Sequence, residues 1–184
     1  MLTLFILIVF ILSFYAGYRR GTAYQLFFTV GYVISFIVAL VFYQGLGESL
    51  QLFVPYPSVT SESNMVYYSI EQGFNLDQAF YAGFAFIVIL FFGWLITHFL
   101  AIFFRNLLYL VLVPRFDGIV AGVVAFVIAY SAVFLLLKLA SFVPMALVQN
   151  AISGSAVARF IIDYSLFLSG AFDNLWVTRI IGQI

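Results

Sequence analysis

Four long apolar stretches occupy most of the 184 residues, and the charged side chains lie almost entirely between or after them. Each stretch approaches the roughly 20 residues that a helix needs to cross about 30 Å of hydrocarbon. Hydrophobic residues make up 66% of the chain and charged residues 8%, whereas roughly a quarter of the residues in a soluble domain are charged. The sequence therefore predicts an all-α integral membrane protein whose spans are surrounded by the lipid bilayer.

We predict a four-span helical bundle over residues 1–143 and an amphipathic C-terminal region over residues 144–184. The spans are expected at about residues 2–18, 22–43, 79–104 and 118–143, with an outer loop over residues 46–78. A signal peptide is the alternative for the first stretch, but it would carry basic residues before the apolar run. Here Arg19 and Arg20 follow that run. The first span is short, so a re-entrant path that dips in and returns also stays open.

The distribution of charge predicts the orientation. Basic residues in short connections mark the cytoplasmic side of a membrane protein. Arg20 follows the first span, and Arg105 and Arg115 lie between the third and fourth. The loop over residues 46–78 carries four acidic residues and no Lys or Arg. We therefore expect a multi-pass protein of the bacterial plasma membrane with both termini outside the cell.

The C-terminal region alternates between apolar and polar segments. Residues 149–155 are small and polar, whereas apolar side chains follow helical spacing from Ala156 to Leu168. A second amphipathic piece is expected around Phe172 to Ile180. Helices of this length and charge are typical of the membrane interface. They would either cap the bundle or dock a partner.

Few residue types suited to catalysis or ligand binding are present. The chain has no cysteine and one histidine, and its acidic residues lack the spacing of metal ligands. No glycine-rich loop followed by lysine is present for phosphate binding, and no basic run suggests nucleic acid. We therefore predict no catalytic site, no metal and no cofactor, and we do not expect an enzyme.

Two ionisable side chains fall inside predicted spans, where burial in hydrocarbon is costly. His98 lies near the inner end of the third span, and Lys138 lies near the outer end of the fourth. Because they occupy opposite leaflets, they are not expected to pair. We favour a hydrogen bond from His98 to a carbonyl on a neighbouring helix over a proton relay. For Lys138 we favour an extended side chain that reaches the outer headgroups.

Two glycine pairs lie at the predicted inner surface. Gly17 and Gly21 flank the first turn, and Gly118 and Gly122 open the fourth span after Asp117. Glycines four residues apart allow helix backbones to approach closely. An ion pair between Arg20 and Asp117 would clamp the first hairpin to the fourth span. The alternative is that the cytoplasm hydrates both charges.

These residues carry a resemblance to a known family. The segment Gly17-Tyr-Arg-Arg-Gly21, followed by Gln25-Leu-Phe and Gly31, resembles the start of the colicin V production protein (CvpA) family. The Asp117-Gly118 pair with Gly122 is similar to the family's second recurring patch, and the tail from Ser155 to Ile162 is similar to its C-terminal region. The chain departs from many relatives at Tyr164-Ser-Leu-Phe-Leu-Ser169, where those relatives have a proline before the Leu-Ser.

The resemblance implies a bacterial inner-membrane protein linked to production or export of a small peptide toxin and to envelope homeostasis. It implies no established biochemical activity. Such a protein would act through contacts with itself, as a homo-oligomer, or with other membrane proteins. The competing hypothesis is an oligomeric small-solute transporter or channel lined by His98, Lys138, Gln25 and Gln44.

Overall fold

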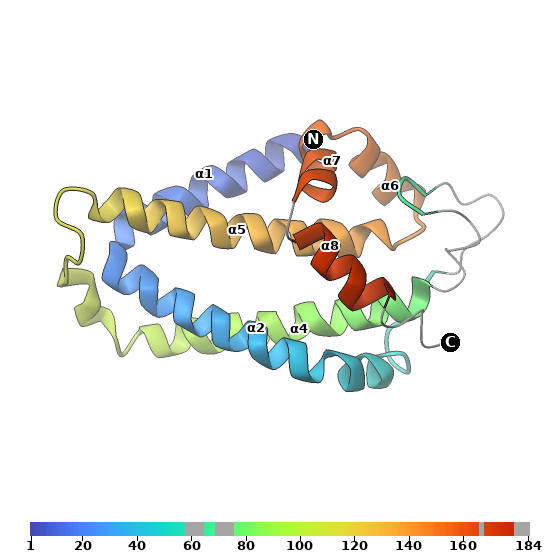
Figure 1. Cartoon of the computed structure of the whole chain (residues 1–184), viewed down its shortest axis with the longest axis horizontal. Helices are drawn as coiled ribbons and strands as arrows, with labels where there is room; N and C mark the ends of the chain where they lie inside the picture. The colour runs from blue at the N-terminus through green and yellow to red at the C-terminus, as the bar shows by residue number, and fades with distance from the viewer. Residues whose placement is uncertain (58–64, 69–75, 166–167, 179–184) are drawn as a thin grey trace. The chain divides into compact units, whose positions relative to one another are not determined.

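The computed structural model describes residues 1–57, 65–68, 76–165 and 168–178, and within them all regular structure is helical (Figure 1). The elements in chain order are α1 (Leu2–Arg20), α2 (Thr22–Leu50), α4 (Leu76–Ala101), the 3-10 helix η1 (Arg105–Tyr109), α5 (Asp117–Ser141), α6 (Ala146–Ser153), α7 (Ala156–Tyr164), α8 (Leu168–Phe172) and the π-helix η2 (Asp173–Thr178). No described residue lies in a strand. The predicted all-α class is confirmed.

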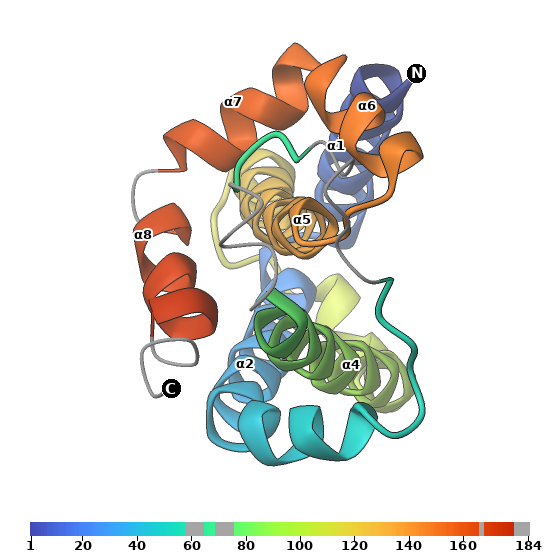
Figure 2. The same cartoon turned by 90° about the vertical axis from the view of Figure 1, so that its right-hand side faces the viewer.

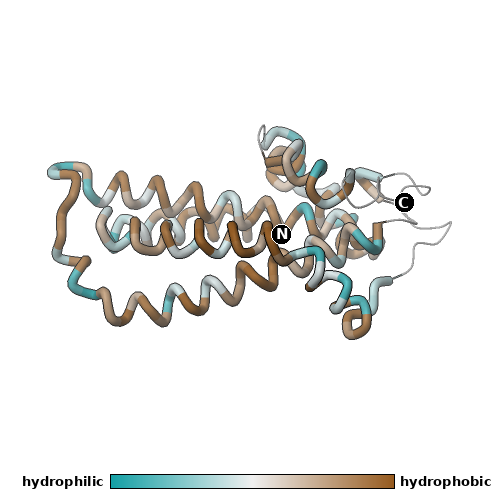
Figure 3. The backbone as a smooth tube through the Cα atoms, turned by 60° about the horizontal axis from the view of Figure 1, so that its bottom comes forward, coloured by the Kyte–Doolittle hydropathy of each residue, from teal (hydrophilic) through white to brown (hydrophobic). Residues whose placement is uncertain are grey.

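Four of these helices, α1, α2, α4 and α5, are long and apolar enough to cross a membrane. Figure 3 shows that hydrophobic residues dominate these helices and that polar residues gather at their ends and in the C-terminal region. In α1, only 11% of the most apolar 18-residue window is buried within the protein. Since apolar side chains on a soluble protein would not stay exposed over such lengths, lipid is the solvent for these faces.

The second span differs most from its predicted bounds. The helix α2 continues to Leu50 rather than ending near residue 43, because Gly45 and Gly47 keep helical backbone and the first proline after it is Pro55. The helix α4 begins at Leu76. Residues 46–50 and 76–78 of the predicted outer loop are therefore helical, and its acids Glu62 and Glu71 lie outside the described residues.

A single residue separates the first two spans. Gly21 has φ +73°, which is left-handed backbone, and its N–H donates to the carbonyl of Gly17 at 3.2 Å. Glycine adopts this backbone without the steric cost that a Cβ atom brings. The helix α2 then begins at once with Thr22.

The described residues divide into two compact units, each with segments from all four long helices. The turn unit contains Leu7–Val41 and Val88–Ala132, and so both arginine-bearing connections. The tail unit contains the described parts of Met1–Ile6, Phe42–Ile87 and Val133–Ile184. Its core is aromatic: the ring centroids of Phe172 and Trp176 lie 4.9 Å apart, and those of Phe86 and Trp176 lie 5.6 Å apart.

The C-terminal helices pack in the tail unit (Figure 2). The helix α7 begins at Ala156, as predicted, because the Ser155 hydroxyl caps it by accepting from the N–H of Ala158 at 3.1 Å. The Ser155 hydroxyl also lies 2.8 Å from that of Thr3. The small, polar segment over residues 149–155 begins within a helix that the sequence did not lead us to expect, because α6 runs through Ser153. Placement of these helices in a membrane interface stays a prediction.

Gln149 is a polar residue of α6 that points into the protein, which the polar character of its segment does not indicate. Its side chain is buried, with 2% of its surface exposed. The amide nitrogen donates to the carbonyl of Val143 at 2.8 Å, and the amide oxygen accepts from the N–H of Val66 at 3.0 Å. A polar residue thus links α6 to the end of α5 and to the loop before α4 inside the tail unit.

Candidate functional site

The glycines of the two motifs lie at a close contact between α1 and α5 in the turn unit. A Cβ atom on Gly17 would lie 2.5 Å from the Cβ of Ala125 and 2.6 Å from the carbonyl oxygen of Ala121. A Cβ on Gly118 or on Gly122 would lie 2.9 Å from the ring of Tyr18 or of Phe14, respectively. These separations are below van der Waals contact, so larger residues at these positions would force the helices apart.

A second small-residue contact, not expected from the sequence, joins α2 and α4. Gly31 faces the side chain of Thr97, and Gly93 faces that of Ser35. The Ser35 hydroxyl donates to the carbonyl of Gly31, and the Thr97 hydroxyl donates to that of Gly93, each at 2.7 Å. The signal was a pair of small residues four apart in each span, which is typical of packed membrane helices.

Asp117 connects the first hairpin to α5. Its carboxylate accepts from the N–H of Thr22 at 3.0 Å and from the Thr22 hydroxyl. It also accepts from the N–H groups of Leu112 and Val113, at 3.2 and 3.3 Å. These donors belong to the start of α2 and to the turn before α5, where backbone N–H groups have no helical partner. One side chain thus holds both chain connections.

The predicted ion pair between Arg20 and Asp117 is wrong. The guanidinium of Arg20 lies 4.3 Å from the ring centroid of Phe28, in a cation–π contact. The hairpin is joined to α5 by Thr22 instead, a residue the sequence analysis did not consider. Its position directly after Gly21 was the available signal, because threonine is common at helix starts.

His98 bonds within its own helix rather than to a neighbouring one, so that prediction is wrong. Its Nδ1 lies 3.0 Å from the carbonyl oxygen of Trp94, one turn earlier in α4. Its ring centroid lies 4.3 Å from that of Trp94 and 4.9 Å from that of Phe28. The residue is half-buried among aromatic rings.

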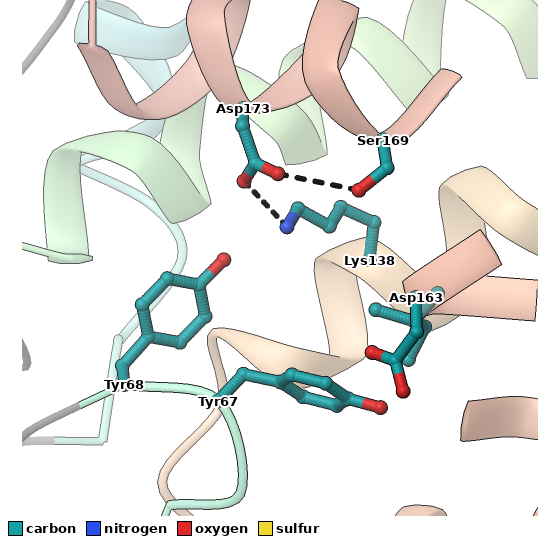
Figure 4. A pocket seen from close by; sticks show the side chains of 7 residues that line it. Tyr67, Tyr68, Lys138, Asp163, Ser169 and Asp173 are labelled. Carbon is teal, nitrogen blue, oxygen red and sulfur yellow. Dashed lines mark hydrogen bonds and ion pairs between the residues drawn. The ribbon is translucent and has the colours of Figure 1, made fainter. Parts of the chain in front are cut away.

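Lys138 forms a buried ion pair in the tail unit, and the predicted extension towards the headgroups is wrong. Its ammonium lies 2.5 Å from a carboxylate oxygen of Asp173 in η2, and its side chain is 5% exposed (Figure 4). The ring centroids of Tyr68 and Phe142 lie 5.6 and 5.9 Å from the ammonium. Sequence reasoning missed Asp173 because periodicity does not pair residues so far apart along the chain.

The side chains in the described ranges suggest no metal centre. No group of three or more His, Cys, Asp or Glu residues among them could hold a metal ion. The two candidate ionisable residues, His98 and Lys138, belong to different units. The structure brings together the glycines and Asp117 of the turn unit, and separately Lys138 with Asp173.

Comparison with known proteins identifies the family. Residues 2–166 match the model of the colicin V production protein family. The chain is 26% identical over 176 residues to the uncharacterized transmembrane protein YshB of Bacillus subtilis (strain 168), which covers 96% of this chain and 97% of the relative. No solved structure matches the chain. The resemblance inferred from the glycine motifs is confirmed, and the chain belongs to the colicin V production protein family.

Proposed function

We propose that this chain is a non-enzymatic protein of the bacterial inner membrane that supports production or secretion of a peptide toxin of the colicin V type. A broader part in envelope homeostasis belongs to the same proposal. The observation that carries it is the family match over residues 2–166. The four apolar helices support the membrane location, and the arginine-bearing connections support termini outside the cell.

The protein would act through helix-face contacts with a second copy or with other membrane proteins. An apolar stripe on α4 supports this mode of action. Phe92, Ile96 and Phe99 are all exposed and lie three or four residues apart, and the exposed Phe103 follows in the turn after the helix. Residues with this spacing share one face of a helix. The stripe offers a continuous surface for another membrane helix.

The transporter alternative has less support. A polar path would place His98, Lys138, Gln25 and Gln44 beside small residues. Instead His98 lies against aromatic rings, and the ammonium of Lys138 is paired with Asp173. The side-chain amide of Gln44 donates to the neighbouring Tyr43 hydroxyl at 3.1 Å.

A gene deletion tests the toxin role. In a producing strain, deletion should lower secreted toxin activity, and the chain supplied from a plasmid should restore it. Secretion at the wild-type level in the deletion strain would contradict the proposal. Solute flux into liposomes that carry the purified chain, if abolished by His98→Ala or Lys138→Ala, would favour the transporter instead.

Photo-crosslinking tests the mode of action. A photoreactive amino acid in place of Phe99 on the α4 stripe should capture a second copy or another membrane protein. The matched control is Val33 on α2, an exposed apolar residue outside the stripe. Capture of lipid alone from position 99 would contradict action through this helix face.

A further inference from the structure

A polar hollow lies beside the Lys138–Asp173 pair, within the tail unit. Its volume is about 310 Å³, which is at the lower end of the range for small-molecule sites. Lys138, Asp163, Ser169 and Asp173 line it together with two tyrosines (Figure 4), and Ile162 adds an apolar patch. At roughly 30 Å³ for each water molecule, this hollow has room for about ten water-sized groups.

Two tyrosine hydroxyls of this hollow are buried beside charged side chains. The hydroxyl oxygens of Tyr67 and Tyr68 are buried and bond to no other described residue. The Tyr67 hydroxyl points towards Asp163 and the Tyr68 hydroxyl towards Lys138 (Figure 4). Each lies close enough for its neighbour to act on its pKa, but among the described residues neither contact has the geometry of a full hydrogen bond. A buried donor left unpaired costs free energy. An acceptor in the hollow would remove that cost.

Both phenols are donors at neutral pH. Burial, with a smaller contribution from the nearby Asp163 carboxylate, raises the pKa of Tyr67 to about 12. Burial also raises the pKa of Tyr68 above its ordinary value of 10.0. The hollow thus presents two hydroxyl donors and the ammonium of Lys138, a set suited to an anionic oxygen group.

The carboxylates of the hollow differ in their partners. Asp173 is occupied, because it pairs with Lys138 and accepts from the Ser169 hydroxyl at 3.4 Å. Asp163 is exposed at the rim and forms no ion pair with any residue that the structure describes. With the tyrosines neutral, the lining carries one positive and two negative charges. Arg159, one turn earlier in α7, acts on Tyr67 of the hollow but forms no salt bridge with Asp163 among the described residues. The carboxylate of Asp163 therefore still suits a cationic group.

We propose that this hollow binds a small zwitterionic group, a primary ammonium joined by a short linker to a phosphate or carboxylate. The anionic oxygens accept from Tyr67, Tyr68 and Lys138, and the ammonium pairs with Asp163. The same chemistry occurs in a free metabolite and in an aminophospholipid headgroup. Each donor that the fold leaves unpaired then has a partner, as does the carboxylate at the rim.

Titration calorimetry on the full chain in dodecyl maltoside, which carries neither amine nor phosphate, tests the proposal. O-phosphoethanolamine is the soluble probe. Inorganic phosphate has only its anionic group, and ethanolamine has only its ammonium group. Phosphoethanolamine should bind more tightly than either half. Nanodiscs then distinguish a free metabolite from a lipid headgroup. If the headgroup occupies the site, phosphatidylethanolamine nanodiscs should compete with the soluble probe, and phosphatidylcholine nanodiscs should not.

Two variants remove the two halves of recognition. Asp163→Asn should weaken phosphoethanolamine binding roughly tenfold or more, the usual effect of a lost charged hydrogen bond, and should leave phosphate binding unchanged. Tyr67→Phe should weaken the binding of both probes. Matched controls are Glu48→Gln, an exposed acid in the same unit, and Tyr164→Phe, an exposed tyrosine next to Asp163. Neither control should change affinity.

Two outcomes would overturn the proposal. One is no heat of binding with phosphoethanolamine at concentrations up to about 10 mM, well above the affinity range of small-molecule sites. The other is native affinity in both Asp163→Asn and Tyr67→Phe. Far-UV circular dichroism should show native helix content in both variants, since Asp163 is exposed and phenylalanine keeps the shape of the Tyr67 ring. Should one variant fail to fold, the other still decides.

Discussion

The Lys138–Asp173 pair predicts an asymmetry between two substitutions. Its charges lie 2.5 Å apart, and the two side chains differ in exposure, at 5% for Lys138 and 43% for Asp173. At an effective dielectric constant of about 20, their gross attraction is roughly 7 kcal/mol, much of it offset by the cost of desolvation. Removal of one partner strands the other charge. Water then hydrates Asp173, which is already 43% exposed, more fully than it hydrates Lys138, which is 5% exposed.

Asp173→Asn should therefore destabilise the protein by about 3 kcal/mol or more, in the range for an uncompensated buried charge. Lys138→Met should cost about 1 kcal/mol or less, because methionine fills a similar volume and the freed carboxylate is hydrated. Adding Lys138→Met to Asp173→Asn should recover most of the loss. The free energy of unfolding is measured by denaturant titration in micelles, followed by tryptophan fluorescence. Equal costs, or a larger cost for Lys138→Met, would refute the reasoning.

Three further predictions use the same unfolding assay. Gly17→Ala should lower the free energy of unfolding by about 2 kcal/mol, because its Cβ would lie 2.5 Å from that of Ala125. The control Gly45→Ala, with nothing within 4 Å of its Cβ, should be neutral or stabilise by about 0.5 kcal/mol. Similar losses of stability in the two variants would contradict the close contact. Asp117→Ala should cost about 2 kcal/mol or more by stranding its N–H donors, and an unchanged midpoint would exclude that role. Burial, with the nearby Asp77 and Tyr81, raises the pKa of Tyr56 from 10.0 to about 12, so its contribution to stability is complete below pH 10 and is lost as pH rises through about 12. Tyr56→Phe should remove that loss, and an unchanged slope between pH 10 and 12 would show that another group causes it.

Composition and periodicity were sufficient for the spans because lipid imposes one requirement on every residue of a span. A helix that crosses hydrocarbon must be apolar over its whole length, so α1, α4 and α5 begin and end close to their predicted bounds. The end of α2 was harder to place. After residue 43 the chain becomes more polar, and the sequence does not show whether a helix continues outside the bilayer.

Side-chain partners were not predictable in the same way. Lys138 and Asp173 are close only because η2 packs beside the end of α5 in the tail unit, and no local pattern encodes that contact. The expected pair of Arg20 and Asp117 rested on their opposite charges and on their shared position beside the glycine motifs at the inner surface. The structure instead gives Asp117 the N–H groups near the start of α2 and before α5, which are obligatory donors. Asp117 therefore bonds to backbone N–H groups, which opposite charge alone does not reveal, and not to the Arg20 guanidinium.

Single-cysteine labelling tests the membrane topology most directly, because the native chain contains no cysteine. Cysteines would replace Gln51 at the end of α2, Val33 within α2 and Arg115 between the last two spans, all exposed positions. In intact cells, a membrane-impermeant maleimide should label Gln51→Cys alone. After permeabilisation it should also label Arg115→Cys, whereas Val33→Cys should stay unlabelled because hydrocarbon surrounds it. Labelling of Val33→Cys as strong as that of Gln51→Cys, or labelling of Arg115→Cys in intact cells, would contradict a four-span protein with its arginine-bearing turns inside.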